Sequence, residues 1–191
     1  GGWPEGLDGV LYRIGPNPQF APIPPYNPLQ GEGMAHAFFM SDGRVSYRNR
    51  WVRTRRFLLE REAGRALFST SDPRMNHPKV AGVDGQGAAN THILTHADRL
   101  FALEEGHAPI ALDPATLETL GPCDFDGRLS GALTAHPKID PLSGEMLAFT
   151  NLPDRQLDGR IDLHVFDIRG ALTQSRSIQA PYPALVHDFA V

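Results

Sequence analysis

Short apolar segments follow one another along most of the chain, and glycines and prolines separate them. Residues 36–52 join an apolar stretch, a Ser-Asp-Gly-Arg turn and a stretch that alternates apolar and polar side chains, which predicts a β-hairpin. From residue 90 onward the connections become tight, with apolar segments at 90–96, 99–105 and 108–113 and a fourth that begins within 114–121. This pattern is typical of an all-β protein.

Three stretches of the first ninety residues depart from this pattern. The proline-rich stretch 13–33 predicts an extended loop, because proline fixes φ and lacks a backbone N–H and so fits neither a helix nor a central strand. Residues 57–68 have the only helical composition, and the polar stretch 71–89 predicts a loop.

The strand pattern repeats along the second half of the chain. Asp113 and Asp167 lie 54 positions apart in similar hairpins, and His136 and His187 lie 51 positions apart. Four short strands in about 50 residues are typical of one blade of a β-propeller. A β-sandwich also has short strands, but it does not need such a repeat, so we favour the propeller. The second cycle of predicted strands covers 131–139, 145–151, 160–168 and 172–180, and a third begins at 185–191.

Composition and charge narrow the class of protein. The 191 residues, 41% of them hydrophobic, are enough for one globular domain with its own core. A net charge of −4 provides no basic surface for nucleic acid. Cys123 is the single cysteine, which excludes an internal disulfide and fits a cytoplasmic location, and no apolar run is long enough to span a bilayer. Because the chain starts without methionine and ends within a predicted strand, we expect it to be a segment of a longer protein.

Two histidines lie among small and apolar neighbours, His136 in GALTAHPKID and His187 in PALVHDFAV. In a propeller the first strand of each blade lines the central axis, so side chains one repeat apart converge there. Neutral imidazoles on rigid strands can then bind a metal ion. A lone buried histidine is more often a hydrogen-bonded core residue, and two ligands do not complete a zinc or iron site. On spacing alone both interpretations stay open, and any further ligands would lie beyond Val191.

Other polar and aromatic side chains are weaker candidates. Glu104 and Glu105 follow an apolar strand and point to opposite faces, so one faces inward and could accept the second N–H of a ligand imidazole. Composition alone favours two solvated turn residues. A surface or capping role is the simpler interpretation for the other histidines, which are His36, His77, His92, His96, His107 and His164.

Several motifs together carry a family resemblance over nearly the whole chain. In order they are LYRIGPNPQF, GEGMAHAFFMSDGRVSYRNRWVRT, ANTHILTHADRLFALEEGHAPIALDPATLETLG, TAHPKIDP and HDFAV. They resemble the carotenoid cleavage oxygenases, a family that includes apocarotenoid and lignostilbene dioxygenases. The resemblance implies an all-β fold that is the N-terminal part of a seven-bladed β-propeller, with a non-haem Fe²⁺ on its axis. It also implies that His136 and His187 are the first two of four histidine ligands and that Glu105 orients a ligand histidine.

The family's chemistry is the oxidative cleavage of a conjugated C=C bond to carbonyl products. The resemblance therefore implies a carotenoid or apocarotenoid substrate, with dioxygen as co-substrate and a peripheral membrane contact for substrate uptake. A stilbenoid is the alternative substrate; the stilbenoid-cleaving branch has a lysine near the position of Glu104, which this chain lacks. Apolar candidates for the core or a substrate tunnel, with the core as the simpler interpretation, are Phe38, Phe39, Phe101 and Phe149.

Two other classes of protein use the same architecture. A calcium-dependent propeller hydrolase binds its axial ion through carboxylate and amide oxygens, whereas the axial candidates here are imidazoles. A non-catalytic propeller would bind partners only, but residues 90–191 carry neither the WD nor the Kelch signature.

Overall fold

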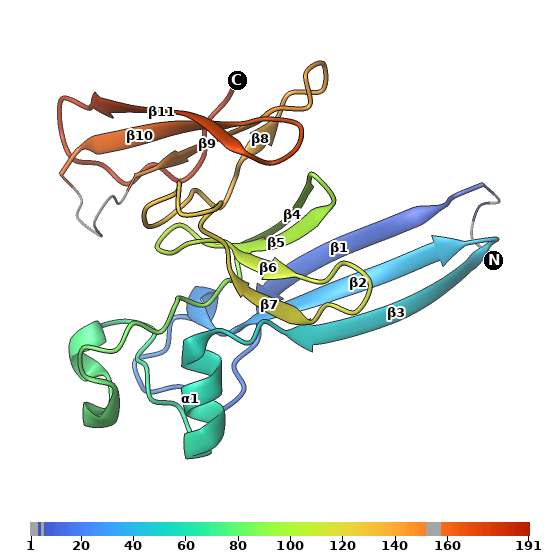
Figure 1. The fold of residues 1–191 in the computed structure, drawn as a ribbon. Helices are drawn as coiled ribbons and strands as arrows, with labels where there is room; N and C mark the ends of the chain where they lie inside the picture. Colours follow the sequence, from blue (N-terminus) through green and yellow to red (C-terminus); the bar gives the residue numbers. More distant parts are fainter. Residues whose placement is uncertain (1–3, 5, 152–157) are drawn as a thin grey trace.

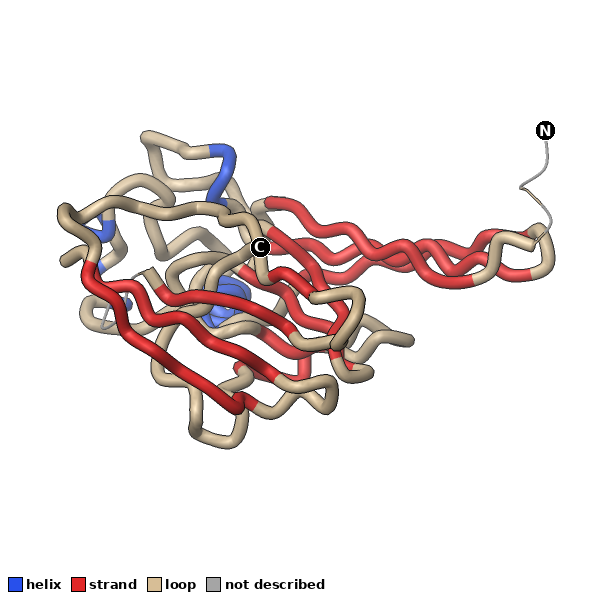
Figure 2. Tube along the Cα trace, turned by 90° about the horizontal axis from the view of Figure 1, so that it is seen from above, coloured by secondary structure: helices blue, strands red, loops and turns tan. Residues whose placement is uncertain are grey.

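The computed structural model describes residue 4 and residues 6–151 and 158–191, which form three antiparallel sheets and one α-helix (Figure 1). Two sheets have four strands, in the orders β4-β5-β6-β7 and β11-β10-β9-β8, and the third has the order β1-β2-β3. This third sheet extends away from the rest of the molecule (Figure 2). The strands are β1 (Gly9–Pro16), β2 (Gly33–Ser41), β3 (Arg44–Trp51), β4 (His92–His96), β5 (Arg99–Leu103), β6 (Ile110–Leu112), β7 (Thr119–Pro122), β8 (Lys138–Ile139), β9 (Met146–Thr150), β10 (Arg160–Phe166) and β11 (Leu172–Gln179).

The two four-stranded sheets are successive blades with the same connections. In each sheet, strands that are neighbours in sequence pair with one another. The β6–β7 and β10–β11 turns begin at the two aspartates of the predicted repeat. Asp113 Oδ1 accepts a hydrogen bond from Thr116 N at 2.7 Å, and Asp167 Oδ1 accepts one from Ala171 N at 2.9 Å. The predicted repeat and its propeller-type blades are therefore confirmed.

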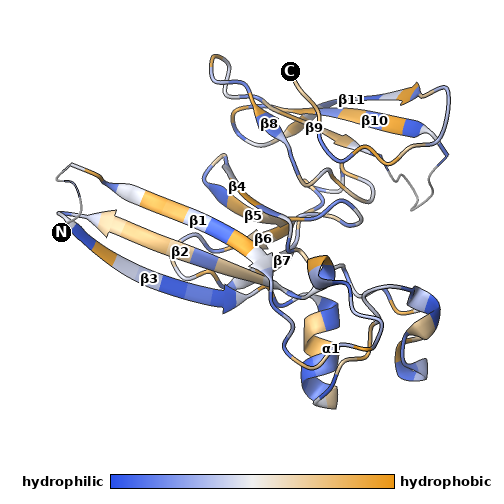
Figure 3. Ribbon diagram, turned by 180° about the vertical axis from the view of Figure 1, so that it is seen from behind, coloured by the Kyte–Doolittle hydropathy of each residue, from blue (hydrophilic) through white to orange (hydrophobic). Residues whose placement is uncertain are grey.

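Strand β5 is buried on both faces and separates two apolar clusters. Leu100 and Ala102 pack with residues of β2, β6 and the loop before β4, whereas Phe101 and Leu103 pack against the next blade. Alternate residues of a strand point to opposite faces, so a strand between two layers is apolar at nearly every position. The exposed strand β3 is in contrast mostly hydrophilic (Figure 3).

The structure corrects two predicted boundaries. The predicted loop at 13–33 is wrong at its start, because Arg13–Pro16 continue β1 at the edge of its sheet, where proline is tolerated. The predicted helix at 57–68 is instead α1 (Arg55–Ala63). Thr54 caps its first turn by accepting a hydrogen bond from Phe57 N, and Gly64 ends it in the left-handed conformation at φ 67°.

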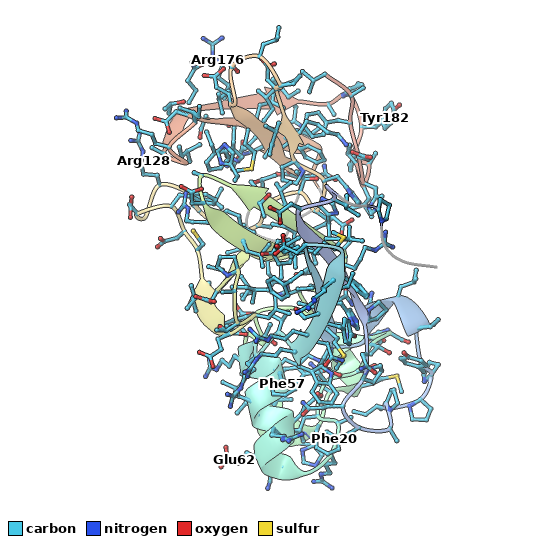
Figure 4. All side chains as sticks on the ribbon, turned by 90° about the vertical axis from the view of Figure 1, so that its right-hand side faces the viewer. Phe20, Phe57, Glu62, Arg128, Arg176 and Tyr182 are labelled. Atoms are coloured by element: carbon cyan, nitrogen blue, oxygen red, sulfur yellow. The ribbon has the colours of Figure 1, made fainter. Side chains whose placement is uncertain are left out.

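The remaining N-terminal segments are loops with short 3₁₀ turns. Helix α1 packs Phe57 into the body of the protein, and Glu62 extends from its outer end into solvent (Figure 4). None of the described helices is long and apolar enough to cross a bilayer. The 3₁₀ turns are η1 (Pro28–Gln30), η2 (Pro73–Met75) and η3 (Pro78–Val80), the last two within the predicted loop 71–89.

Helix α1 contributes to a buried charged cluster. Arg56 Nη2 lies 2.9 Å from Glu32 Oε1, and Arg56 Nε lies 3.8 Å from Glu60 Oε2. Glu60 is 1% exposed and accepts hydrogen bonds from Leu67 N and Phe68 N. Burial and, to a smaller degree, a hydrogen bond to Glu32 raise the pKa of Glu60 to about 7, since its two N–H donors and Arg56 offset only part of the lost hydration.

Glu60→Gln should remove a pH dependence of stability. The folded-state pKa of Glu60 lies above its ordinary value of 4.5, so the folded state retains a proton that the unfolded state releases. This group's contribution to stability is therefore complete below pH 4.5 and is lost as the pH rises to about 7, by up to about 3 kcal/mol. Glutamine keeps the acceptor oxygen without the charge, so the variant's stability relative to wild type should rise over that range. Urea unfolding at pH 5 and pH 8 measures the difference; parallel pH profiles would contradict it.

Candidate metal centre

His136 lies at the β8 edge of the second blade, two residues before that strand begins. The prediction of a strand over 131–139 is wrong for most of its length, because only Lys138–Ile139 pair with β9. Pro137 follows the histidine and has no N–H to donate to a strand partner. The local backbone is held in another way, since Thr134 Oγ1 accepts a hydrogen bond from His136 N at 3.1 Å and Thr134 N donates to Phe149 O at 2.7 Å.

His187 reaches the same place from a segment without regular secondary structure. The strand predicted at 185–191 is absent, because no strand of the described chain pairs with these residues. The backbone is held by Asn151, whose Oδ1 accepts a hydrogen bond from Val186 N at 2.6 Å. The two histidine rings nevertheless meet, with their centroids 4.6 Å apart and their planes at 75°.

Three side chains converge at this point. His136 Nε2 lies 3.1 Å from His187 Nε2, and His187 Nδ1 contacts Glu105 Oε1. Each of the three residues offers one ligand atom, and these atoms lie within 4.8 Å of one another. The predicted site residues therefore lie together, although they come from three separate segments.

The donor atoms fit a bound cation. A carboxylate only accepts hydrogen bonds, so His187 Nδ1 carries the proton toward Glu105, and Nε2 presents a lone pair to His136. Two nitrogens at right angles around one ion, each about 2.1 Å from it, are about 3.0 Å apart. The observed 3.1 Å agrees with that separation. Imidazole nitrogen suits zinc, copper, iron or nickel, whereas calcium prefers oxygen ligands.

The adjacent residues Glu104 and Glu105 point to opposite sides of the chain, as the alternation of side chains after a strand predicts. Glu105 contacts His187, whereas Glu104 Oε1 contacts His107 Nδ1, and His107 Nε2 lies 3.5 Å from Asp84 Oδ1. The expectation that both glutamates are solvated turn residues is therefore wrong for both, because each side chain is mostly buried and contacts a histidine. His107 also lines a cavity of about 470 Å³, together with Asp84, Gln86, Gly106, Ala108, Ile110, Pro122, Asp124, Leu129, Ser130, Gly131 and Ala132.

His92 is a site neighbour that the sequence did not single out. It lies on β4, the first strand of its blade, and its ring centroid is 5.4 Å from that of His136. Burial lowers the pKa of His92, and the nearby His136 and Lys138 lower it further, whereas Asp188 raises it. This imidazole is therefore neutral at neutral pH. Its place at the start of a strand cycle, equivalent to that of His136, is the signal that could have identified it.

Two other histidines are buried rather than at the surface. His164 is 7% exposed and lies between Thr150 Oγ1 at 3.0 Å and Ser175 Oγ at 2.9 Å, and burial lowers its pKa. His96 is 6% exposed, and its Nε2 lies 3.1 Å from Gly144 O. The surface interpretation is therefore wrong for both. Each ring nitrogen of His164 has a hydrogen-bond partner, whereas the buried Nδ1 of His96 has none in the part of the chain that the structure describes. His77 does cap η3, as predicted.

The aromatic candidates divide between core and partly buried positions. Phe101 is 1% exposed and Phe149 is 3% exposed, so the core interpretation holds for both. Phe38 and Phe39, on β2, are partly buried.

The propeller-type blades and the convergent imidazole pair indicate a β-propeller protein with a candidate metal centre beside the first strand of a blade. The whole chain, residues 1–191, matches the family described as Retinal pigment epithelial membrane protein. The chain thus belongs to this family, the carotenoid cleavage oxygenases.

Individual relatives agree with this assignment. Isoeugenol monooxygenase from Pseudomonas nitroreducens is 37% identical over 190 residues, which are 98% of this chain and 40% of that protein. The lignostilbene dioxygenase of Pseudomonas brassicacearum superposes with a TM-score of 0.93 at 37% identity, over 100% of this chain and 40% of that one. A cobalt-substituted apocarotenoid oxygenase of Synechocystis has a TM-score of 0.76 at 32% identity, over 97% and 41%. The chain thus spans about 40% of the length of these relatives.

Proposed function

We propose that residues 1–191 form the N-terminal part of a non-haem Fe²⁺ dioxygenase that cleaves a conjugated C=C bond to carbonyl products. The observation that supports this most is the pair of Nε2 atoms 3.1 Å apart, with Glu105 on the outer nitrogen of His187. His136 and His187 would be two of the iron ligands, and the others would come from a further part of the protein. The cytoplasmic location remains a prediction.

The roles of the chain's own residues follow from their contacts. Bound iron would supply the activation of dioxygen. Glu105 accepts a hydrogen bond from Nδ1–H of His187 and so fixes the tautomer that leaves Nε2 free for a metal. His136 and His187 are both neutral ligands, so neither offsets the charge of the ion. Burial keeps the neighbouring His92 uncharged by lowering its pKa, which avoids adding a positive charge beside the cation.

Two substrate classes are candidates. The family resemblance first suggests a carotenoid or apocarotenoid, and one relative is a carotenoid cleavage oxygenase of Neurospora crassa. A stilbenoid is the second candidate, because relatives of 37–40% identity have names that refer to isoeugenol and resveratrol, and the lignostilbene dioxygenase has a TM-score of 0.93.

Metal and product analysis of the full-length protein tests the proposal. We expect co-purified iron and dioxygen-dependent formation of two carbonyl products from either an apocarotenoid or a hydroxystilbene. The preferred substrate separates the two classes. Bound calcium, or no bound metal and no dioxygen uptake with either substrate, would overturn it in favour of a hydrolase or a binding module.

Glu105→Ala should weaken metal binding and activity by about 10- to 100-fold, because His187 loses the acceptor that orients its ring. Metal titration and turnover of the full-length variant measure the effect. The matched control is Glu104→Ala. It also removes a carboxylate, but this carboxylate contacts His107 and not His187. Equal losses of metal affinity in both variants would show that Glu105 has no specific role.

A further inference from the structure

The segment that carries His187 has no strand partner, and its backbone is tied to the second blade by the hydrogen bond from Val186 N to Asn151 Oδ1 at 2.6 Å. Residues 183–191 belong to no strand or helix, and the His187 side chain is 60% exposed. A metal ligand needs a defined position, because errors of a fraction of an ångström weaken binding. The hydrogen bond of Val186 precedes His187 in the chain, so a second contact after His187 would fix the position of the imidazole from both sides.

An ion pair joins the two histidine segments beside the rings. Lys138 Nζ lies 2.7 Å from Asp188 Oδ1. Lys138 is the first residue of β8 and lies two positions after His136, while Asp188 directly follows His187. The pair therefore connects the paired strand β8 to the irregular segment within two residues of each imidazole.

Further contacts give the pair a defined geometry. Asp188 Oδ1 also accepts a hydrogen bond from Phe189 N at 2.8 Å, which fixes the carboxylate relative to its own backbone. Lys138 Nζ lies 5.7 Å from the centroid of the Phe189 ring, and that ring meets Phe149 of β9 edge-on at 5.2 Å. Phe189 thus packs against the blade while Asp188 binds its edge strand.

This arrangement is poorly explained as a source of global stability. The side chains of Lys138 and Asp188 are 35% and 51% exposed, and ion pairs this exposed contribute little to folding. The pair also leaves no net charge, because Asp188 offsets the ammonium group of Lys138 next to a site for a cation. Both properties suit a local positioning role.

We propose that the Lys138–Asp188 ion pair is a clamp that holds the His187 imidazole at the distance from His136 that a shared metal ion requires. This inference rests on the proposed function, in which both histidines bind one metal. Lys138 and Asp188 are positioning residues, since they act through the histidine segments rather than on the metal or the substrate.

The test compares Co²⁺ binding by the full-length protein and its variants, using the visible absorption of bound cobalt and the dissociation constant. Lys138→Met and Asp188→Asn should each weaken binding about tenfold and alter the spectrum, with a melting temperature within about 2 °C of wild type. Lys138→Arg should restore most of the affinity. The double variant should bind no more weakly than the single variants, because both changes remove the same contact.

Two controls make the outcome specific. Arg160→Met removes another ion pair of the same blade, with Asp162 at 2.6 Å, and should leave cobalt binding unchanged. His187→Ala should abolish cobalt binding. If His187→Ala does so while Lys138→Met binds cobalt like wild type, the clamp is refuted and the proposed function stands. If His187→Ala itself binds normally, the proposed metal centre fails and the clamp with it.

Discussion

His136→Ala should abolish metal binding and C=C cleavage in the full-length protein, with a loss of more than about 100-fold in metal affinity. Losing a residue that only orients a ligand already costs about 10- to 100-fold, so losing the ligand itself should cost more. His136 Nε2 faces His187 Nε2 at 3.1 Å, and no other residue of the described chain joins this group of ligand atoms apart from Glu105. Metal content after dialysis and dioxygen-dependent turnover measure the effect.

His77→Ala is the matched control for this prediction. His77 caps η3, and neither of its side-chain contacts, with Arg65 and with the backbone of Lys79, involves the candidate metal centre. This variant should retain its metal and its activity. Wild-type metal content in His136→Ala would remove His136 from the ligand set.

Phe166→Ala should destabilise the fold by about 3–5 kcal/mol. Phe166 is fully buried on β10, and its ring centroid lies 4.4 Å from that of Phe125, which in turn lies 5.7 Å from Phe101 of the preceding blade. Truncation removes apolar surface and leaves a cavity between two blades that cannot fully close. Chemical denaturation with a tryptophan or circular-dichroism signal measures the loss.

The control for this second prediction is a residue of the same blade, Leu142. Leu142 is 95% exposed in the turn between β8 and β9, so Leu142→Ala should change stability by less than about 0.5 kcal/mol. A loss below about 1 kcal/mol in Phe166→Ala would mean that the contact between the blades does not carry the stability that its burial indicates.

Local sequence pattern was sufficient for the strand order and the repeat. The aspartates of the repeat, Asp113 and Asp167, accept backbone hydrogen bonds in equivalent turns, and a short polar residue at such a turn is a local signal. The side chains of β5 point alternately to its two faces, and this alternation likewise depends only on strand geometry. Local pattern was insufficient at His136, because strand pairing begins only after Pro137, at Lys138, whereas the apolar composition alone suggests a strand that starts earlier.

The β-rich fold, the blade length and the selection of His136, His187 and Glu105 as candidates could all be predicted from the sequence, because turn chemistry, side-chain alternation and family motifs are local features. The residues that surround those three became visible only in the folded chain. The half-buried place of His92 beside His136 and the Lys138–Asp188 ion pair depend on how separate segments pack at one edge. Contacts between residues some fifty positions apart follow from the packing of whole blades, and no short stretch of sequence encodes that packing.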